Sequence, residues 1–229
     1  MAEMTGIFDL TVPVVLAHPH LFEAVKFKRG GKEQGEAKYG GSFVFEADNP
    51  DLKELKARAV ALAKAKWPGR DIAADFKAKQ FKFPWSSGDA IVAKRVAKLQ
   101  AAGKQDDHKG DFQLGKVVLK SSSKYAPRMA VIANGKIVDL DDSNRALYKN
   151  QFYFGVKVLA QLNLVPYDKV GETGLDGVTA YINLVLSTNK GERLSGGASA
   201  AEVFKGYVGS VSAEDPTAGG DSLDEEIPF

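Results

Sequence analysis

The sequence of 229 residues contains no cysteine. This absence excludes disulfide bonds, thiolate zinc sites and a cysteine nucleophile, and it is the usage expected in a reducing compartment. No run reaches the roughly 18 apolar residues of a membrane span, and Met1 to Gly6 lacks the basic and apolar stretches of a secretion signal. We therefore expect a cytoplasmic protein without a membrane partner.

Lysine and arginine are missing from the last 20 residues, 210–229, which hold six acidic residues. Because the whole chain has a formal net charge of +2, this tail carries −6 and the rest of the chain carries +8. The tail is also rich in Ser, Pro, Gly and Ala, the composition of a flexible linker. We predict a basic folded domain over residues 1–209 and a flexible acidic tail over residues 210–229. The domain then suits an anionic ligand, and the tail either competes with that ligand or binds a partner.

Alternating apolar and β-branched residues predict several short strands, over residues 8–15, 39–46, 111–120, 129–132, 153–165 and 178–186. Pro13 is expected at an edge or bulge of the first strand, and His18-Pro19-His20 is expected to end it. If residues 76–85 are extended, Lys77, Lys79, Phe81, Phe83 and Trp85 lie on one face.

Helices are predicted where capping residues precede apolar residues at helical spacing. Asn49 and Pro50 begin a helix over residues 49–67, and Asp89 caps another over residues 90–102 that Gly103 ends. A capping box at residues 199–202 predicts a short helix over residues 200–207. Many short strands with two or three inserted helices indicate a mainly β fold with helical insertions (α+β), either a small barrel or a sandwich.

Candidate catalytic residues are few. His18 and His20 lie two residues apart without a third metal ligand nearby, and His108 lies in a polar loop, so all three are interpreted as surface histidines. Asp139, Asp141 and Asp142 resemble a magnesium site, but turn and cap chemistry explains them equally well. The glycine runs match no phosphate-binding loop. We expect no catalytic residue, no metal and no cofactor.

Basic and aromatic residues interleave in three stretches, at residues 76–85, 120–128 and 145–157. Single nucleic-acid strands are held by cations along the phosphates and by aromatic rings on which bases stack, although such aromatics can instead belong to a core. The residues predicted to contact phosphates are Lys77, Lys79, Lys82, Lys120, Lys124, Arg128, Lys149 and Lys157. The residues predicted to stack on bases are Phe81, Trp85, Tyr125, Tyr148 and Tyr153.

The last nine residues, Asp221 to Phe229, combine four acids with a final Ile-Pro-Phe. They closely resemble the C-terminal tip of bacterial single-stranded DNA-binding proteins. A carboxylate beside a Phe ring suits a partner pocket with a basic rim and an apolar floor, and Pro228 limits the entropy lost on docking. The residues predicted to bind a partner are Asp224, Glu225, Glu226, Ile227, Pro228 and Phe229.

Three further motifs resemble a family of bacteriophage single-stranded DNA-binding proteins. They are His20-Leu-Phe-Glu23, Phe83-Pro-Trp-Ser-Ser-Gly-Asp89, and Gly191-Glu-Arg-Leu-Ser-Gly-Gly197 followed by Phe204. The resemblance covers about residues 8 to 207. It implies an oligonucleotide-binding (OB) barrel with helical insertions, the coating of single strands during phage replication, recombination or repair, and a detachable acidic tail.

These observations lead to one functional hypothesis and two rivals. We expect a non-enzymatic protein of the host cytoplasm that binds single-stranded DNA with little sequence preference. Its tail is expected to compete with DNA and to recruit replication or recombination proteins, and its removal is expected to allow double-stranded DNA to bind as well. The rivals are a strand-annealing recombination protein and a metal-dependent nuclease that uses the acids near Asp139.

Overall fold

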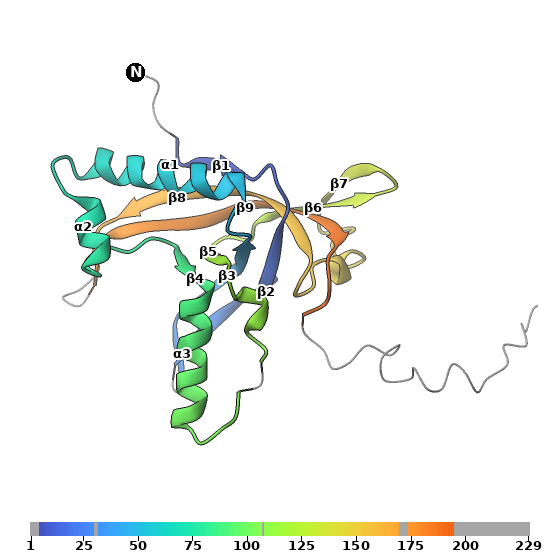
Figure 1. Cartoon of the computed structure of the whole chain (residues 1–229). Coiled ribbons are helices and arrows are strands. Elements are labelled where there is room, and N and C mark those ends of the chain that lie inside the picture. The colour runs from blue at the N-terminus through green and yellow to red at the C-terminus, as the bar shows by residue number, and fades with distance from the viewer. Residues whose placement is uncertain (1–4, 30–31, 107, 170–173, 195–229) are drawn as a thin grey trace, which may run out of the picture. The chain divides into compact units, whose positions relative to one another are not determined.

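The computed structural model describes residues 5–29, 32–106, 108–169 and 174–194, in which a nine-stranded sheet carries inserted helices (Figure 1). The strands are β1 (Ile7–Asp9), β2 (Val14–Arg29), β3 (Lys32–Phe45), β4 (Trp85–Ser87), β5 (Val117–Ser123), β6 (Arg128–Ala133), β7 (Lys136–Leu140), β8 (Lys157–Tyr167) and β9 (Gly177–Lys190). The helices are α1 (Pro50–Lys66), α2 (Ile72–Lys77) and α3 (Gly88–Ala101), with 3-10 turns η1 (Asp111–Gln113) and η2 (Lys149–Gln151). The predicted boundary at residue 209 and the predicted helix over residues 200–207 lie outside the described residues.

The strands follow the order β4-β5-β3-β2-β8-β9-β6-β7, and β1 pairs with β8 beside this path. All pairs are antiparallel except β6 with β9. The sheet curls, since Ser121 Oγ of β5 donates a hydrogen bond to the carbonyl oxygen of Ala180 of β9 at 2.8 Å. The prediction of a mainly β fold with helical insertions is confirmed. A ladder between β5 and β9, which would close the sheet into a barrel, is not among the strand pairs of the described residues.

Helix α1 lies along β8 and β9 and covers the main core (Figure 1). The predicted helix over residues 49–67 is confirmed with its cap, because Asn49 Oδ1 accepts a hydrogen bond from the backbone N–H of Asp51 at 2.9 Å. The Asp51 side chain is only 6% exposed, and its carboxylate accepts hydrogen bonds from Thr11 and Val12 at 2.7–2.8 Å. This carboxylate therefore ties the link between β1 and β2 to the start of α1.

Helix α3 covers a second, smaller apolar cluster around Ala17, Val44 and Val118. The predicted helix over residues 90–102 is present but begins earlier, with Ser87 rather than Asp89 at the cap position. Instead of capping the helix, Asp89 accepts a hydrogen bond from the backbone N–H of Gly115 at 2.9 Å. None of the described helices combines the length and the apolar character needed to cross a membrane.

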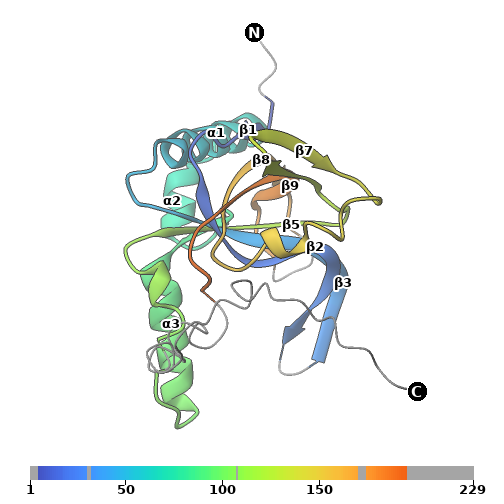
Figure 2. The same cartoon turned by 90° about the vertical axis from the view of Figure 1, so that its right-hand side faces the viewer.

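Two strand predictions near the N-terminus need correction. The predicted strand over residues 8–15 is divided between β1 and β2, and His18-Pro19-His20 does not end it, because β2 continues to Arg29. Strand β3 is correspondingly longer than the predicted 39–46. The long hairpin formed by β2 and β3 projects on the same side of the sheet as α3, at a distance from it (Figures 1 and 2).

Two other segments also differ from the expected strands. The predicted strand over residues 111–120 begins only at Val117, after the turn η1. Strand β7 was not predicted. It pairs with β6 across Asn134-Gly135, both of which have positive φ (50° and 72°), as a tight two-residue hairpin turn requires. The remaining predicted strands correspond to β6, β8 and β9 within a few residues.

Candidate nucleic-acid interface

A bulge in β2 shapes a basic groove on the described surface. The pairing of β2 with β3 changes register between Ala17 and His20, and His18 has a positive φ of 50°. Regular alternation would place Leu16 and Leu21 on opposite faces, since they are an odd number of residues apart. Both are buried in the core, so the bulge has restored the inward direction of the second leucine. The same irregularity leaves His18 and His20 exposed beside it.

Two adjoining cavities follow β2 from this bulge, and together we call them the groove. The first has a volume of about 350 Å³ and lies between β2 and the segment that contains η2. The second has a volume of about 640 Å³ and lies over β2, β3 and β5. The two cavities share His20 and Val25, so they form one continuous surface. An extended chain has room to lie along it.

The lining of the groove is positively charged. Its cationic residues are Lys26, Lys38, Lys120, Lys149 and Arg193, and its acidic residues are Glu23 and Glu36. Lys149 Nζ lies 3.3 Å from Glu23 Oε1, but both side chains are largely exposed, so solvent screens this pair. The groove therefore keeps an excess of positive charge that suits phosphates.

Aromatic side chains and glycines complete the groove. Tyr39 lines the second cavity and Tyr153 the first. The Tyr153 hydroxyl donates a hydrogen bond to the carbonyl oxygen of Gly191 at 2.8 Å, and the guanidinium of Arg193 lies over its ring at 4.4 Å. Gly40 and Gly41 follow Tyr39, and a Cβ at Gly40 would come within 2.8 Å of Ser121 O. Gly40 thus allows the close approach of β3 to β5 beside Tyr39.

Arg145 contacts the part of β2 that lines the first cavity. Its Nη2 donates to the carbonyl oxygens of Leu21 and Phe22, at 3.1 and 3.3 Å, and its guanidinium lies over the Phe22 ring at 5.2 Å. Phe22 in turn packs edge-on against Phe152, with ring centroids 5.6 Å apart. These contacts hold the part of β2 after the bulge against the segment that carries Lys149 and Tyr153.

The pKa of His18 reflects the positive charge of the groove. Its ring packs against Phe154, with centroids 4.6 Å apart. Partial burial of the ring against Phe154 lowers the pKa of His18, and the positive charges of His20, Lys120 and Arg95 lower it further. The folded protein therefore favours the neutral imidazole, and this residue's contribution to stability is lost as the pH falls below about 6.5, the unfolded pKa.

Five of the predicted contact residues lie in the groove or directly beside it. Lys120, Lys149 and Tyr153 line the groove. Lys124 and Tyr125 follow Ser122 and line a third cavity of about 510 Å³. Tyr125 is 78% exposed. The structure thus brings together residues from two of the three stretches that the sequence indicated.

The stretch over residues 76–85 is not extended throughout, which was the condition for its side chains to share one face. Its first residues belong to α2, which Asp71 caps through a hydrogen bond from the backbone N–H of Ala74 at 3.0 Å, and Lys79 has a positive φ of 59°. Phe81, which was expected to stack on a base, is corrected to a core residue, because it is 2% exposed and packs edge-on against Trp67. Its ring has no face free for a base.

The other predicted contact residues are placed apart from the groove. Lys77 and Trp85 line a pocket between α1, α2 and β4, and Lys79 and Lys82 are exposed between α2 and β4. The remaining three lie as follows: Arg128 is exposed 3.8 Å from Asp139, Tyr148 packs against the main core, and Lys157 lines a cavity at the start of β2. Their roles in binding stay predictions.

Sequence reasoning missed part of the groove. The missed residues are His18, His20, Lys26, Lys38, Tyr39 and Arg193. The run Lys38-Tyr39-Gly40-Gly41 has a cation and an aromatic ring next to two glycines, and this pattern in a predicted strand was the available signal. The positions of His18 and His20 depend on the bulge, which the sequence did not indicate.

The acids near Asp139 have structural roles. Asp141 Oδ1 accepts hydrogen bonds from the backbone N–H groups of Ser143 and Asn144 at 2.8 and 3.2 Å, and the Ser143 hydrogen bonds lower the pKa of Asp141. This is the turn chemistry that the sequence offered as an alternative to a metal site.

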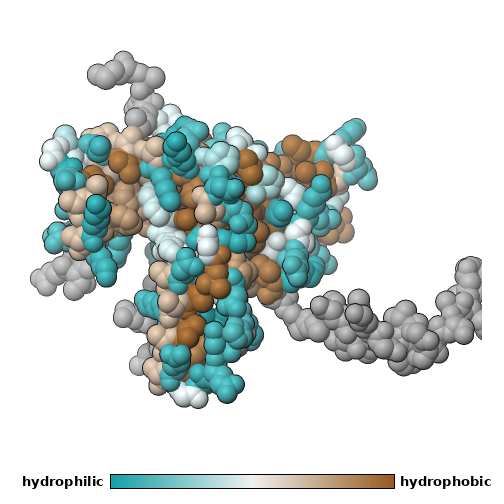
Figure 3. Space-filling model, viewed as in Figure 1, coloured by the Kyte–Doolittle hydropathy of each residue, from teal (hydrophilic) through white to brown (hydrophobic). Residues whose placement is uncertain are grey.

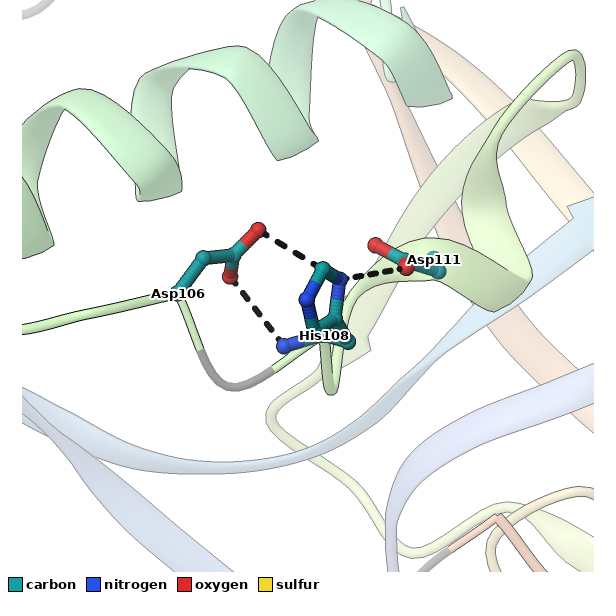
Figure 4. Close-up of side chains that lie close together, drawn as sticks. All are labelled: Asp106, His108 and Asp111. Carbon is teal, nitrogen blue, oxygen red and sulfur yellow. Dashed lines mark hydrogen bonds and ion pairs between the residues drawn. The ribbon is translucent and has the colours of Figure 1, made fainter.

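One other cluster contains three potential metal ligands within the described residues: Asp106, His108 and Asp111 (Figure 4). His108 Nδ1 lies 3.0 Å from Asp111 Oδ2, and the backbone N–H of His108 donates to Asp106 Oδ1 at 3.1 Å. The His108 side chain is 76% exposed. Hydrogen bonds within a surface loop account for the cluster.

A curled sheet with a basic, aromatic groove is a feature of proteins that bind an extended polyanion. The sequence profile of the single-stranded DNA-binding protein of Enterobacter phage Enc34 matches residues 10–216. The chain therefore belongs to this family of phage single-stranded DNA-binding proteins, which are not enzymes. The resemblance inferred from the sequence motifs is confirmed.

Solved structures of bacteriophage Enc34 proteins are similar to this fold. The single-stranded DNA-binding protein of that phage in complex with single-stranded DNA superposes with a TM-score of 0.52 at 16% identity, covering 80% of this chain and 86% of that one. The same phage protein alone gives 0.53 at 15% identity, with 82% and 84% covered, and its C-terminal truncation gives 0.53 at 16%, with 79% and 84% covered. A search of curated protein sequences gives no match.

The environment of His18 gives a prediction about Lys120. We expect Lys120→Gln to raise the pKa of His18 toward 6.5, because the substitution removes one of the positive charges that disfavour the imidazolium. An NMR titration of the imidazole resonances measures this pKa. Lys136→Gln, on β7 outside the groove, is the matched control and should leave the value unchanged. An unchanged His18 pKa in Lys120→Gln would contradict the charge arrangement described for the groove.

Proposed function

We propose that the groove binds single-stranded DNA and that many copies of this protein coat exposed single strands during phage replication, recombination or repair. The observation that carries the proposal is the continuous groove, in which five cations face two acids and Tyr39 and Tyr153 offer rings. Membership of the phage single-stranded DNA-binding family supports it.

In this proposal the groove cations bind phosphates and its aromatic rings stack on bases. The proposed phosphate contacts are Lys26, Lys38, Lys120, Lys149 and Arg193, with Lys124 at the edge. Tyr39, Tyr153 and Tyr125 are the proposed stacking residues. Stacking on any base is similar in strength, so sequence preference is slight. We further propose that the curled sheet is an OB-type barrel, supported by the hydrogen bond between Ser121 and Ala180.

We also propose that the acidic tail over residues 210–229 regulates access to the groove. Its six acids oppose the positive charge of the folded domain, so the tail competes with DNA for the cations. When DNA displaces it, residues 224–229 become available to a replication or recombination protein. Removal of the tail also lets double-stranded DNA bind, because attraction to phosphates does not distinguish strands.

Single charge substitutions test the groove. We expect Lys120→Gln and Lys149→Gln each to weaken binding of a labelled oligo-dT and to lower the slope of log K against log salt by about 0.7, because each removes one phosphate contact. Fluorescence anisotropy at several salt concentrations measures both quantities. Lys136→Gln is the control of equal charge change. If all three variants kept the affinity and slope of the unaltered protein, DNA would not lie in the groove.

Deletion of residues 221–229 tests the tail. We expect the shortened protein to bind single-stranded DNA more tightly at low salt and to gain measurable affinity for duplex. The difference in DNA affinity between the shortened and the full-length protein should become smaller at higher salt, because salt screens the charges. Anisotropy titrations with both kinds of oligonucleotide, at low and moderate salt, measure it. Equal affinities of the two proteins at low salt would show that the tail does not compete.

A further inference from the structure

A second cavity with a defined chemistry lies away from the groove, between α1, α2 and β4, and we call it the α1–α2 pocket. Its volume is about 660 Å³. Its apolar lining is Val60, Ile72, Phe76, Phe83 and Trp85, and its cationic lining is Lys56, Lys64, Arg70 and Lys77. Figure 3 shows apolar surface at this end of the molecule, among the hydrophilic residues of α1 and α2.

The apolar wall of the α1–α2 pocket is a set of ordered aromatic rings. Phe83 stacks on Trp85, with centroids 4.4 Å apart and planes at 11°. Phe76 meets Phe83 edge-on at 5.2 Å and is 42% exposed. Aromatic area exposed in a concave site is a feature of interaction surfaces. The wall is therefore suited to an aromatic or branched apolar side chain.

The rim of this pocket carries positive charge. Among the residues that the structure describes, Lys56, Lys64 and Lys77 have no acidic partner. Arg70 differs, because it is ion-paired with both Asp75 and Asp176 and hydrogen bonds with these two acids raise its pKa. The one acid of the lining, Asp71, caps α2. The rim thus offers three lysines to an acidic ligand.

One segment of this chain has the complementary chemistry. Residues 224–229, Asp-Glu-Glu-Ile-Pro-Phe, place three acids directly before two apolar side chains and a proline. We propose that this segment docks in the α1–α2 pocket of its own chain, with Phe229 and Ile227 against the aromatic wall and the three acids at the lysine rim. The proposal rests on the proposed role of the tail and names the site that receives it.

Residues 195–229 are long enough for the end of the tail to bind in the pocket of its own chain. The 35 residues from Ser195 to Phe229 can span up to about 120 Å when extended, whereas a domain of this size has a radius of gyration of about 16 Å. A tethered segment also has an effective concentration in the millimolar range, which favours it over the same segment of a second copy in dilute solution.

The pocket and the groove lie on opposite faces of the sheet where β4 pairs with β5. The backbone N–H of Lys120 donates to the carbonyl oxygen of Pro84 at 2.8 Å, and Trp85 pairs with Leu119. Lys120 lines the groove and Trp85 lines the pocket. Trp85 shares the face of its partner Leu119, which lies in the main core, and the next residue, Lys120, points to the opposite face. The pocket is therefore a site separate from the groove.

Photo-crosslinking in the full chain tests this docking. The chain carries p-benzoylphenylalanine in place of Phe229 and is irradiated, and the linked peptides are mapped by mass spectrometry. We expect crosslinks within one chain to residues of the pocket wall, above all Phe76, Phe83 and Trp85. Lys64→Glu should reduce their yield at least fivefold, because it opposes the acids, and Lys136→Glu, the matched control, should not.

The alternatives are distinguishable outcomes of the same experiment. Crosslinks to groove residues such as Lys120, crosslinks to a second copy, or no specific crosslink would each overturn the docking site. A single-stranded oligonucleotide with a photoreactive base that labels the pocket wall would assign the pocket to DNA and overturn it as well. A full-length variant with Asp224→Asn, Glu225→Gln and Glu226→Gln tests competition separately. If this variant binds DNA more tightly while the crosslinks miss the pocket, the tail does compete with DNA, as the proposed function says. The tail then does not dock in the α1–α2 pocket.

Discussion

The groove depends on the irregular pairing of β2 with β3. A regular strand presents alternate residues to one face, so a 16-residue strand would keep a single core face along its whole length. The bulge at His18-Pro19-His20 changes that direction and keeps both Leu16 and Leu21 in the core. It also turns the rest of the hairpin outward, where Lys26, Lys38 and Tyr39 lie beside the cations of β5 and η2.

In the proposed function, charge separation along the chain supplies a regulator of the groove. The folded part is basic and the tail is acidic, although the sum is close to neutral. An acidic segment tethered to a basic surface competes with DNA without any specific contact, and salt weakens both interactions. The proposed docking in the α1–α2 pocket would add a contact that salt affects less, because burial of Phe229 and Ile227 against aromatic rings is not electrostatic.

The sequence predicted those features that depend on neighbouring residues. The cap formed by Asn49 and Pro50 located α1, and the interleaved cations and aromatics located Lys120, Lys149 and Tyr153. The bulge was missed because it is set by the pairing of β2 with a distant part of β3 and by the need to bury Leu21. The stacking role predicted for Phe81 was wrong for a related reason: Phe81 follows α2 and packs in the core against Trp67 at the end of α1. Periodicity alone does not reveal such tertiary contacts.

The central claim is that single-stranded DNA lies along β2, β3 and β5. Backbone chemical shifts of the ¹⁵N-labelled full-length protein, recorded while an oligo-dT is added, test this claim most directly. The account predicts that the largest changes occur at residues 20–26, 38–42, 120–122 and 149–153, with little change in β7. Changes centred on β6 and β7, or on the far side of α1, with none along β2, would contradict it.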